Sequence, residues 1–367
     1  MIDSLLQLER VTADFRRGLP VFIRENASAE PGVLAVAAET LEDDVLAVCR
    51  EQGDPQLLLT HNRAKTLKIR LYTPDIVALQ VTPDKNAEWV HRTADPAFDL
   101  DQPLQGPFEA SRTAPDAASI ASIGLAKLSG LLPAALTVAM TRSTFAAAFE
   151  TDDTTLLTID APAISDYDRQ AAFALRPIAT AQVPLADSED TRLFAFRPAD
   201  GGPEHLAIVI GDPTKFDAPL VRLHSECFTG DLVGSLKCDC GDQLRGAIKA
   251  IADEGGGMVL YLAQEGRGIG LMNKLRAYAL QDKGFDTVEA NERLGFEVDE
   301  RLFSQAKSML THLGLSKIRL LTNNPDKVES LRKFGIDITE RVPHQFPSNE
   351  HNWRYLDTKK HKTGHLL

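Results

Sequence analysis

Three cysteines in the second half of the chain have the residue type and spacing of a metal or redox site. Cys227, Cys238 and Cys240 form a C-x10-C-x-C pattern, and Cys49 stands alone far upstream. Thiolates are strong Zn²⁺ ligands, and three protein ligands leave the fourth tetrahedral position for water. The spacing fits equally well a closed structural zinc site with a fourth ligand from elsewhere, such as His224. A disulfide is disfavoured if the chain resides in a reducing compartment.

Two turns downstream of the cysteines have the composition of phosphate-binding loops. Residues 264–270 read Gln-Glu-Gly-Arg-Gly-Ile-Gly, and the glycines would let a phosphate approach the backbone at the start of a helix. Arg267 could add a bidentate contact. Residues 320–327 form a second strand-to-helix turn, in which Thr322 and Lys327 could hold polar groups. Taken alone, each turn is also explained as an ordinary helix start.

The elements that must position these residues alternate between helix and strand, which predicts an α/β fold with α+β character. In the first half we expect helices over 5–17 and 119–132, helical spacing over 33–48, strands over 20–23 and 56–60, and a loop over 93–116. In the second half we expect a hairpin of strands 193–196 and 206–210, helices over 241–254, 269–282, 299–313 and 325–334, and strands over 257–262, 317–321 and 336–342. A loosened pattern near residue 172 predicts two domains, 1–172 and 173–367.

Composition and charge exclude several classes of protein. The 367 residues carry 40 Lys and Arg against 52 Asp and Glu, a net charge of −12, of which −9 falls in residues 1–185. A generic nucleic-acid binder would need a basic surplus, so an anionic ligand requires locally focused positive charge. Lys127 and Pro133 interrupt the longest apolar stretch, so no membrane span is expected. The first residues lack a basic and apolar leader pattern, and we expect a cytoplasmic protein.

From about residue 190 onward the sequence resembles GTP cyclohydrolase II. The resemblance lies in motifs whose spacing is kept: Arg222–Asp231, Cys238–Gly241, Gln264–Gly270, Asn273–Asp282, Asp286–Asn291, Leu294–Phe296, Asp299–Arg301, Leu321–Pro325 and Tyr355–Lys359. It implies a mixed sheet with flanking helices, and opening of the GTP imidazole ring with release of formate and pyrophosphate. That reaction is the first step of riboflavin biosynthesis. The resemblance further implies one Zn²⁺ per subunit, Mg²⁺ with the substrate triphosphate, and a homodimer.

The same resemblance assigns roles to individual residues. The implied zinc ligands are Cys227, Cys238 and Cys240. Asp299 is the implied general base, Tyr278 would orient water or carry a proton, and Arg301 would be either a nucleophile toward the α-phosphate or a phosphate clamp. The implied GTP contacts are Arg222, Leu223, His224, Ser225, Glu226, Gln243, Glu265, Gly266, Arg267, Thr287, Thr322 and Lys327. Without the resemblance, Tyr278 would be a core residue and Asp299 to Arg301 a helix start.

The first half resembles 3,4-dihydroxy-2-butanone 4-phosphate synthase more faintly, in the layout of residues 1–170. The acidic run that follows the first strand in that family is replaced by Arg24–Gly32, and its metal-binding histidine aligns with Ala118. The segment Ala134–Met140 has no carboxylate where the family keeps a catalytic glutamate. Magnesium binding and enolisation would lack their chemical groups. We therefore expect a degenerate, non-catalytic domain retained for packing, dimerisation or regulation.

Two other functions compete with the cyclohydrolase. One is a GTP-binding sensor or scaffold whose zinc is structural, and the other is a related enzyme of a different pathway. A mere binder needs no combination of Asp299, Arg301 and Tyr278, so the sequence favours the enzyme. The expected partner is GTP as a small-molecule substrate, with no nucleic acid and no membrane. Cys49, on an apolar helical face, is expected to be a buried small residue.

Overall fold

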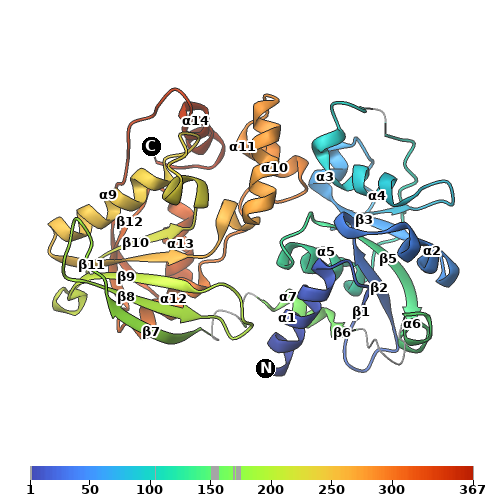
Figure 1. The fold of residues 1–367 in the computed structure, drawn as a ribbon, viewed down its shortest axis with the longest axis horizontal. Coiled ribbons are helices and arrows are strands. Elements are labelled where there is room, and N and C mark those ends of the chain that lie inside the picture. Colours follow the sequence, from blue (N-terminus) through green and yellow to red (C-terminus); the bar gives the residue numbers. More distant parts are fainter. Residues whose placement is uncertain (1, 104, 150–156, 168–169, 171–174, 367) are drawn as a thin grey trace. The chain divides into compact units, whose positions relative to one another are not determined.

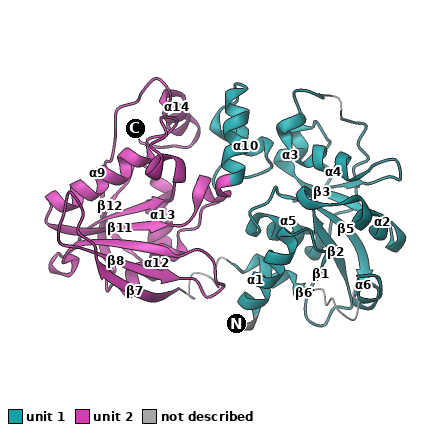
Figure 2. Cartoon of the chain, in the orientation of Figure 1, with its two compact units in different colours: residues 1–167, 272–299 teal, residues 168–271, 300–367 magenta. Residues whose placement is uncertain are grey.

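The computed structural model describes residues 2–103, 105–149, 157–167, 170 and 175–366. The chain forms two compact units, residues 1–167 with 272–299 and residues 168–271 with 300–367 (Figure 2). The predicted boundary at 172/173 lies outside the described residues. The predicted division also differs from these units in one segment, because residues 272–299 pack with the first half of the chain. None of the helices in the described ranges is long and apolar enough to cross a membrane.

The first unit is built on a sheet whose described strands have the order β4-β3-β5-β2-β1-β6 (Figure 1). Its elements are α1 (Ile2–Arg16), β1 (Val21–Arg24), β2 (Pro31–Ala37), η1 (Ala38–Thr40), α2 (Asp43–Gln52), β3 (Gln56–Thr60), α3 (His61–Thr66), β4 (Ile76–Gln80), α4 (Ala87–Ala94), η2 (Pro96–Phe98), α5 (Ala117–Leu128), β5 (Ala134–Thr141), α6 (Arg142–Phe149), β6 (Thr158–Asp160), α7 (Ala161–Ser165), α10 (Gly270–Asp282) and α11 (Thr287–Arg293). Neighbouring strands are antiparallel except β1 and β6.

The helical spacing predicted over residues 33–48 is wrong for its first part. Val33 to Ala37 belong to β2, which lies between β1 and β5, and these five side chains are all buried. A strand covered on both faces reads as a continuous apolar run, which periodicity alone cannot separate from a buried helix. The helical part of the segment begins at Asp43.

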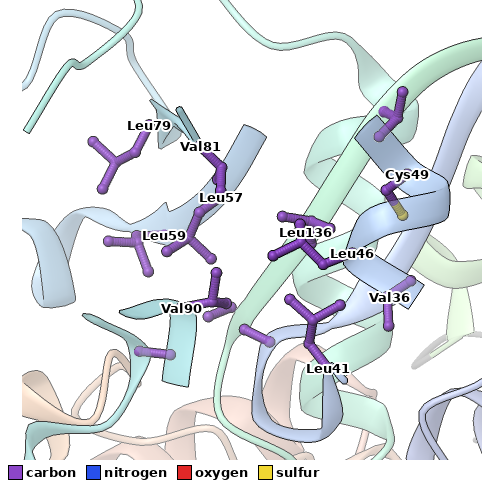
Figure 3. Close-up of a cluster of buried hydrophobic side chains, with 14 of the residues drawn as sticks. Val36, Leu41, Leu46, Cys49, Leu57, Leu59, Leu79, Val81, Val90 and Leu136 are labelled. Atoms are coloured by element: carbon purple, nitrogen blue, oxygen red, sulfur yellow. The ribbon is translucent and has the colours of Figure 1, made fainter. Parts of the chain in front are cut away.

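Buried side chains cover both faces of this first sheet. Figure 3 shows the cluster on one face, to which β2, β3, β4, β5, α2 and α4 contribute; its labelled members are Val36, Leu41, Leu46, Cys49, Leu57, Leu59, Leu79, Val81, Val90 and Leu136. A second cluster on the other face involves α1 and α5. Cys49 is fully buried, and burial raises the pKa of its thiol to about 12. The prediction of a buried small residue is confirmed.

The second unit contains a mixed sheet whose described strands have the order β13-β12-β10-β11-β9-β8-β7. Its elements are β7 (Arg176–Gln182), β8 (Thr191–Arg197), β9 (His205–Gly211), η3 (Pro213–Lys215), β10 (Leu220–Ser225), the π-helical turn η4 (Phe228–Leu232), α9 (Cys240–Asp253), β11 (Gly256–Leu262), η5 (Glu265–Gly268), α12 (Ser304–His312), β12 (Lys317–Leu321), α13 (Pro325–Lys333), β13 (Asp337–Val342) and α14 (Trp353–Lys362). The predicted hairpin (β8–β9) and the predicted mixed α/β fold are confirmed. The helix expected from residue 299 begins only at Ser304, so its predicted start is wrong.

Helices cover the two faces of this second sheet. Apolar side chains of α9 pack with Leu220 and Val259 on one face, whereas α12 and α13 pack with Val221 and Leu260 on the other. Because β10, β11 and β12 run parallel, their carboxyl ends meet at one edge of the sheet. Ligands of open α/β sheets bind at such an edge. The cysteine segment follows β10, and the two turns with phosphate-loop composition follow β11 and β12.

Candidate active site

The three predicted thiols come together just beyond the end of β10. The sulfur atoms of Cys227, Cys238 and Cys240 all lie within 4.8 Å of one another, and the Cys227 and Cys238 sulfurs are 3.8 Å apart. Hydrogen bonding with Cys227, to which burial adds, raises the pKa of the Cys238 thiol to about 11. The pKa of Cys240 is also raised well above its usual range by the neighbouring thiols and burial. Three thiolates this close require a cation to offset their mutual repulsion.

The turn η4 is shaped around these sulfur atoms. A Cβ on Gly230 would lie 2.8 Å from the Cys238 sulfur and 3.0 Å from the Cys227 sulfur, so no larger residue fits the cradle. The Gly230 N–H donates to the Cys227 sulfur at 3.3 Å. Asp231 fixes the turn to its surroundings, because its carboxylate accepts from the Cys227 N–H at 3.0 Å and from the Tyr261 hydroxyl at 3.0 Å.

His224, the alternative fourth ligand, has a different role in the structure. Its Nε2 lies 3.1 Å from both carboxylate oxygens of Asp231, and its ring stacks on Tyr261. Burial lowers the pKa of His224, so the ring is neutral near pH 7 and Nε2–H donates to Asp231. Among the described residues, no histidine or carboxylate joins the group of three thiols. The donor set therefore fits a soft divalent ion such as Zn²⁺ with an open coordination position.

A pocket of about 620 Å³, counting its open mouth, adjoins the thiols at the same sheet edge. Cys240 belongs to both the thiol group and the pocket wall. The described residues that line the pocket are Arg222, His224, Ser225, Cys240, Gln243, Arg267, Arg301, Thr322, Asn323, Asn324, Lys327, Tyr355, Lys359 and His365. Five of these side chains are cationic at neutral pH, which supplies the local positive charge that an acidic chain needs to bind a polyanion.

Two of the cationic side chains are buried and held by backbone carbonyls. The guanidinium of Arg222 donates to the Leu321 carbonyl at 3.0 Å and to the amide oxygen of Gln243. Burial lowers the pKa of Arg222 to about 10, which leaves it protonated at neutral pH. The Lys327 ammonium donates to the Leu223 carbonyl at 2.8 Å. Both groups are thus oriented before any ligand arrives, which reduces the ordering cost of binding.

The turn after β11 has a strained backbone. Gly266 and Arg267 both adopt left-handed angles, with φ of 63° and 62°, and the second is unusual for a residue with a side chain. The Glu265 carboxylate accepts from the Phe228 N–H at 2.6 Å and from the Gly266 N–H at 2.9 Å. This carboxylate therefore ties the turn to η4, and Arg267 is directed into the pocket wall.

The C-terminal helix contributes pocket residues that the sequence analysis did not assign. The Lys359 ammonium of α14 donates to the Asp239 carboxylate at 2.9 Å and lies over the Tyr355 ring. Asp239 sits between two of the thiols in sequence and also accepts from Gln243, so Lys359 is linked to the metal-ligand segment. Burial, with Lys359 acting against it, raises the pKa of Tyr355 to about 12. The sequence feature that could have pointed to these two residues is the Tyr355–Lys359 motif, which is one of the motifs that resemble the family.

Most of the predicted site residues belong to the second unit, and three belong to the first. Nine predicted residues line the pocket: Arg222, His224, Ser225, Cys240, Gln243, Arg267, Arg301, Thr322 and Lys327. Six more belong to the same unit, where Leu223 is a core residue and the others surround the thiols or the strained turn: Leu223, Glu226, Cys227, Cys238, Glu265 and Gly266. The remaining three, Tyr278, Thr287 and Asp299, lie on the segment that packs in the first unit.

These observations define a class of protein: an α/β protein with three clustered thiols that could hold a metal ion beside a cationic pocket that suits a polyanion. A family model described as GTP cyclohydrolase II matches residues 176–343. A protein from Azospirillum brasilense named GTP cyclohydrolase-2 is 47% identical over 366 residues, which cover 99% of this chain and 94% of that one. The chain belongs to the GTP cyclohydrolase II family. The enzyme class and function predicted from the sequence are thereby confirmed.

Other relatives match about half of the chain. A GTP cyclohydrolase-2 from Pseudomonas aeruginosa is 53% identical over 190 residues, 52% of this chain and 92% of that one. One from Hahella chejuensis is 56% identical over 175 residues, 48% of this chain and 84% of that one. The crystal structure of RibBX, a two domain 3,4-dihydroxy-2-butanone 4-phosphate synthase from A. baumannii, has 16% identity and a TM-score of 0.35, covering 92% of this chain and 99% of that one.

Proposed function

We propose that this protein opens the imidazole ring of GTP and releases formate and pyrophosphate. The product would be 2,5-diamino-6-hydroxy-4-(5-phosphoribosylamino)pyrimidine, in the first step of riboflavin biosynthesis. The observation that carries this proposal is the position of Cys240, which belongs to the thiol cluster and also lines the cationic pocket. A nucleotide bound by its phosphates in that pocket would have its base within reach of chemistry at the thiols.

Cys227, Cys238 and Cys240 would hold the metal ion, which we propose is one Zn²⁺ per subunit. When bound, Zn²⁺ supplies Lewis acidity and lowers the pKa of water to about 7. The chain's own contribution is the cradle at Gly230 and the carboxylate of Asp231 that orients η4, and within the described ranges no fourth protein donor joins the three thiols.

The triphosphate, with Mg²⁺ as part of the substrate, would bind to the cationic side chains of the pocket. Arg222 and Lys327 are oriented by backbone carbonyls, and Arg267 is held by a strained turn. Arg301 donates to the Ser225 hydroxyl at 3.5 Å at the same wall. Because a guanidinium keeps its proton in proteins and has no lone pair to offer, we assign Arg301 to clamping a phosphate rather than to nucleophilic attack.

The remaining predicted roles belong to side chains around the pocket and on the segment 272–299. Glu226, Gln243 and Ser225 would contact the nucleotide, whereas Glu265 would position the turn. Tyr278 would orient water or carry a proton during hydration, Asp299 would act as the general base, and Thr287 would contact GTP. Thr287 begins α11 and accepts a hydrogen bond from Gln281 at 3.2 Å. These assignments rest on the motifs that resemble the family.

We further propose that residues 173–367 form the catalytic domain and that residues 1–172 form a non-catalytic, synthase-like domain. The second assignment is supported by Ala118 and Ala134–Met140, which offer neither the imidazole nor the carboxylate that the resemblance would require there. A homodimer in the cytoplasm completes the proposal.

The proposal is tested by incubating the full-length protein with GTP and Mg²⁺ and quantifying formate, pyrophosphate and the diaminopyrimidine, alongside bound zinc. All three products are expected from GTP. A protein that binds zinc and GTP without turnover would be a sensor or scaffold. Turnover of a different nucleotide in preference to GTP would indicate an enzyme of another pathway.

A further inference from the structure

The segment 272–299 is attached to the N-terminal half of the chain by a partly buried, paired ion contact between Arg276 and Glu39. The Glu39 carboxylate accepts two hydrogen bonds from the Arg276 guanidinium, at 2.7 and 3.1 Å, and a third from the Leu132 N–H at 2.9 Å. Arg276 in turn donates to Asn273 at 2.8 Å, and Asn273 donates to the Gly130 carbonyl at 3.1 Å. Paired, charge-assisted bonds of this kind fix orientation as well as adding energy.

A second set of contacts holds the end of the same segment. Thr60 donates to the Gly295 carbonyl at 2.7 Å, and Asn62 donates to the Phe296 carbonyl at 2.9 Å. Gly295 has a φ of 90°, and a Cβ there would lie 2.9 Å from the Thr60 hydroxyl and 2.9 Å from Pro133. The turn that follows α11 is therefore shaped to fit α3 and its surroundings.

The Arg63 guanidinium of the N-terminal half is a buried charge that contacts the end of α11. The Arg63 side chain is 1% exposed and donates to both Asp99 oxygens, at 2.6 and 2.8 Å, and to the Arg293 carbonyl at 3.4 Å. A buried guanidinium is tolerated only when its donors are satisfied. One of the acceptors for Arg63 is the Arg293 carbonyl at the end of α11, so the segment and the N-terminal half stabilise each other.

The segment 272–299 also carries Tyr278, Thr287 and Asp299. On α10, Arg276 and Tyr278 are two residues apart, which places them on roughly opposite sides of the helix. The side that carries Arg276 is thus the one attached to Glu39, and Tyr278 is left on another side.

We propose that the N-terminal half is a positioning scaffold for this catalytic segment: Glu39, through Arg276, and Thr60, Asn62 and Arg63, through residues 293–296, set the conformation that residues 272–299 need for turnover. Glu39 and Asn62 are positioning residues that touch neither substrate nor metal. This inference rests on the proposed function, because the roles of Tyr278 and Asp299 do. It gives a use to the half of the chain for which we propose no catalysis.

The test is a double-mutant cycle in the full-length protein with Glu39→Gln, Arg276→Gln and the pair. Glu39→Gln keeps the shape of the side chain and removes its charge. We expect it to lower kcat for the diaminopyrimidine by roughly tenfold or more, since small misplacements of catalytic groups are costly. The KM for GTP should stay within about twofold, and zinc content should not change. The double variant should be no slower than the slower single variant, because both remove one interaction.

A matched control is Glu42→Gln, an exposed carboxylate three residues further on that makes no capping hydrogen bond. Hydrogen exchange supplies a readout that does not depend on turnover. Compared with the control, amides of α10 should exchange faster in Glu39→Gln, and amides of residues 287–299 should exchange faster in Asn62→Ala. The scaffold proposal is overturned if kcat per folded molecule and exchange are both unchanged, or if the two substitutions add independently. If the wild-type protein itself fails to turn over GTP, the proposed function is refuted instead, and this inference falls with it.

Discussion

The two sheets of this protein place different chemistry at comparable positions. In the second unit, the ends of β10, β11 and β12 lead into three clustered thiols and a pocket with five cationic side chains among its described lining residues. In the first unit, the described residues of the β1–β2 turn and of β5 offer no comparable cluster, because the three thiols are the one group of possible metal ligands among the described residues. The first unit therefore keeps an apolar core on both faces of its sheet, whereas a group of possible metal ligands is found among the described residues of the second unit.

What the first unit retains instead is a set of polar contacts directed at residues 272–299. Glu39 and Arg63, which would be unremarkable charges in an isolated domain, bind atoms that lie more than two hundred residues further along the chain. One region therefore holds reactive groups in a pocket, and the other holds a helix pair in place.

The largest effect is expected when a thiol is removed from the second unit. Cys240→Ser should lower formation of the diaminopyrimidine by about 10³-fold or more, since several kcal/mol of Lewis-acid stabilisation are lost. Metal analysis should show loss of zinc from the same variant. Cys49→Ala is the matched control in the first unit and should keep both zinc and turnover. Normal ring opening by Cys240→Ser would remove the thiol site from the mechanism.

The next effect concerns the segment that the two regions share. Tyr278→Phe should slow formate release by roughly 100-fold, because a positioned acid or base contributes about that much, and pyrophosphate release should suffer less. Both products are measured in one reaction by chromatography. Tyr72→Phe, on an exposed tyrosine of the first unit, should change neither. Equal formate rates in wild type and Tyr278→Phe would make Tyr278 a structural residue.

Lys359 tests the pocket wall formed by the C-terminal helix. Lys359→Met removes the cation bound to Asp239, and we expect a loss of about 10- to 100-fold in kcat/KM for GTP, as for other partners of metal-ligand segments. Lys359→Arg should restore part of that loss, and the exposed neighbour Lys360→Met should have no effect. Unchanged kinetics in Lys359→Met would show that the pocket functions without α14.

The last effect leaves turnover aside and concerns the pH dependence of stability in the second unit. His205 is buried, which lowers its pKa to about 4, and its Nδ1 accepts from the Ala263 N–H at 3.0 Å. Between pH 6.5 and 4 the unfolded chain binds a proton that the folded state refuses, so the free energy of unfolding falls as the pH drops. The loss should reach about 3 kcal/mol near pH 4. The free energy of unfolding, measured by urea titration at each pH from 7 to 4, should fall less steeply with decreasing pH in His205→Gln than in the wild type. In the exposed His351→Gln it should fall as steeply as in the wild type.

The sequence predicts the local parts of this structure well and the long-range parts poorly. The thiol cluster, the strained turn at Arg267 and the β8–β9 hairpin are encoded in short motifs whose residue types leave few alternatives. The strand β2 was mistaken for helix because a run of Val, Leu and Ala has no period that separates the two. The attachment of α10 to Glu39 could not be foreseen, since it joins residues 237 positions apart through side chains that are common on any surface.

The central claim is that the second half performs the chemistry and the first half does not. It is tested most directly by offering one preparation of the full-length protein GTP with Mg²⁺ and, in parallel, ribulose 5-phosphate with Mg²⁺, with mass spectrometry of the products. We predict the diaminopyrimidine, formate and pyrophosphate from GTP, and no butanone phosphate from ribulose 5-phosphate. Formation of butanone phosphate, or no conversion of GTP by zinc-loaded protein, would contradict the account.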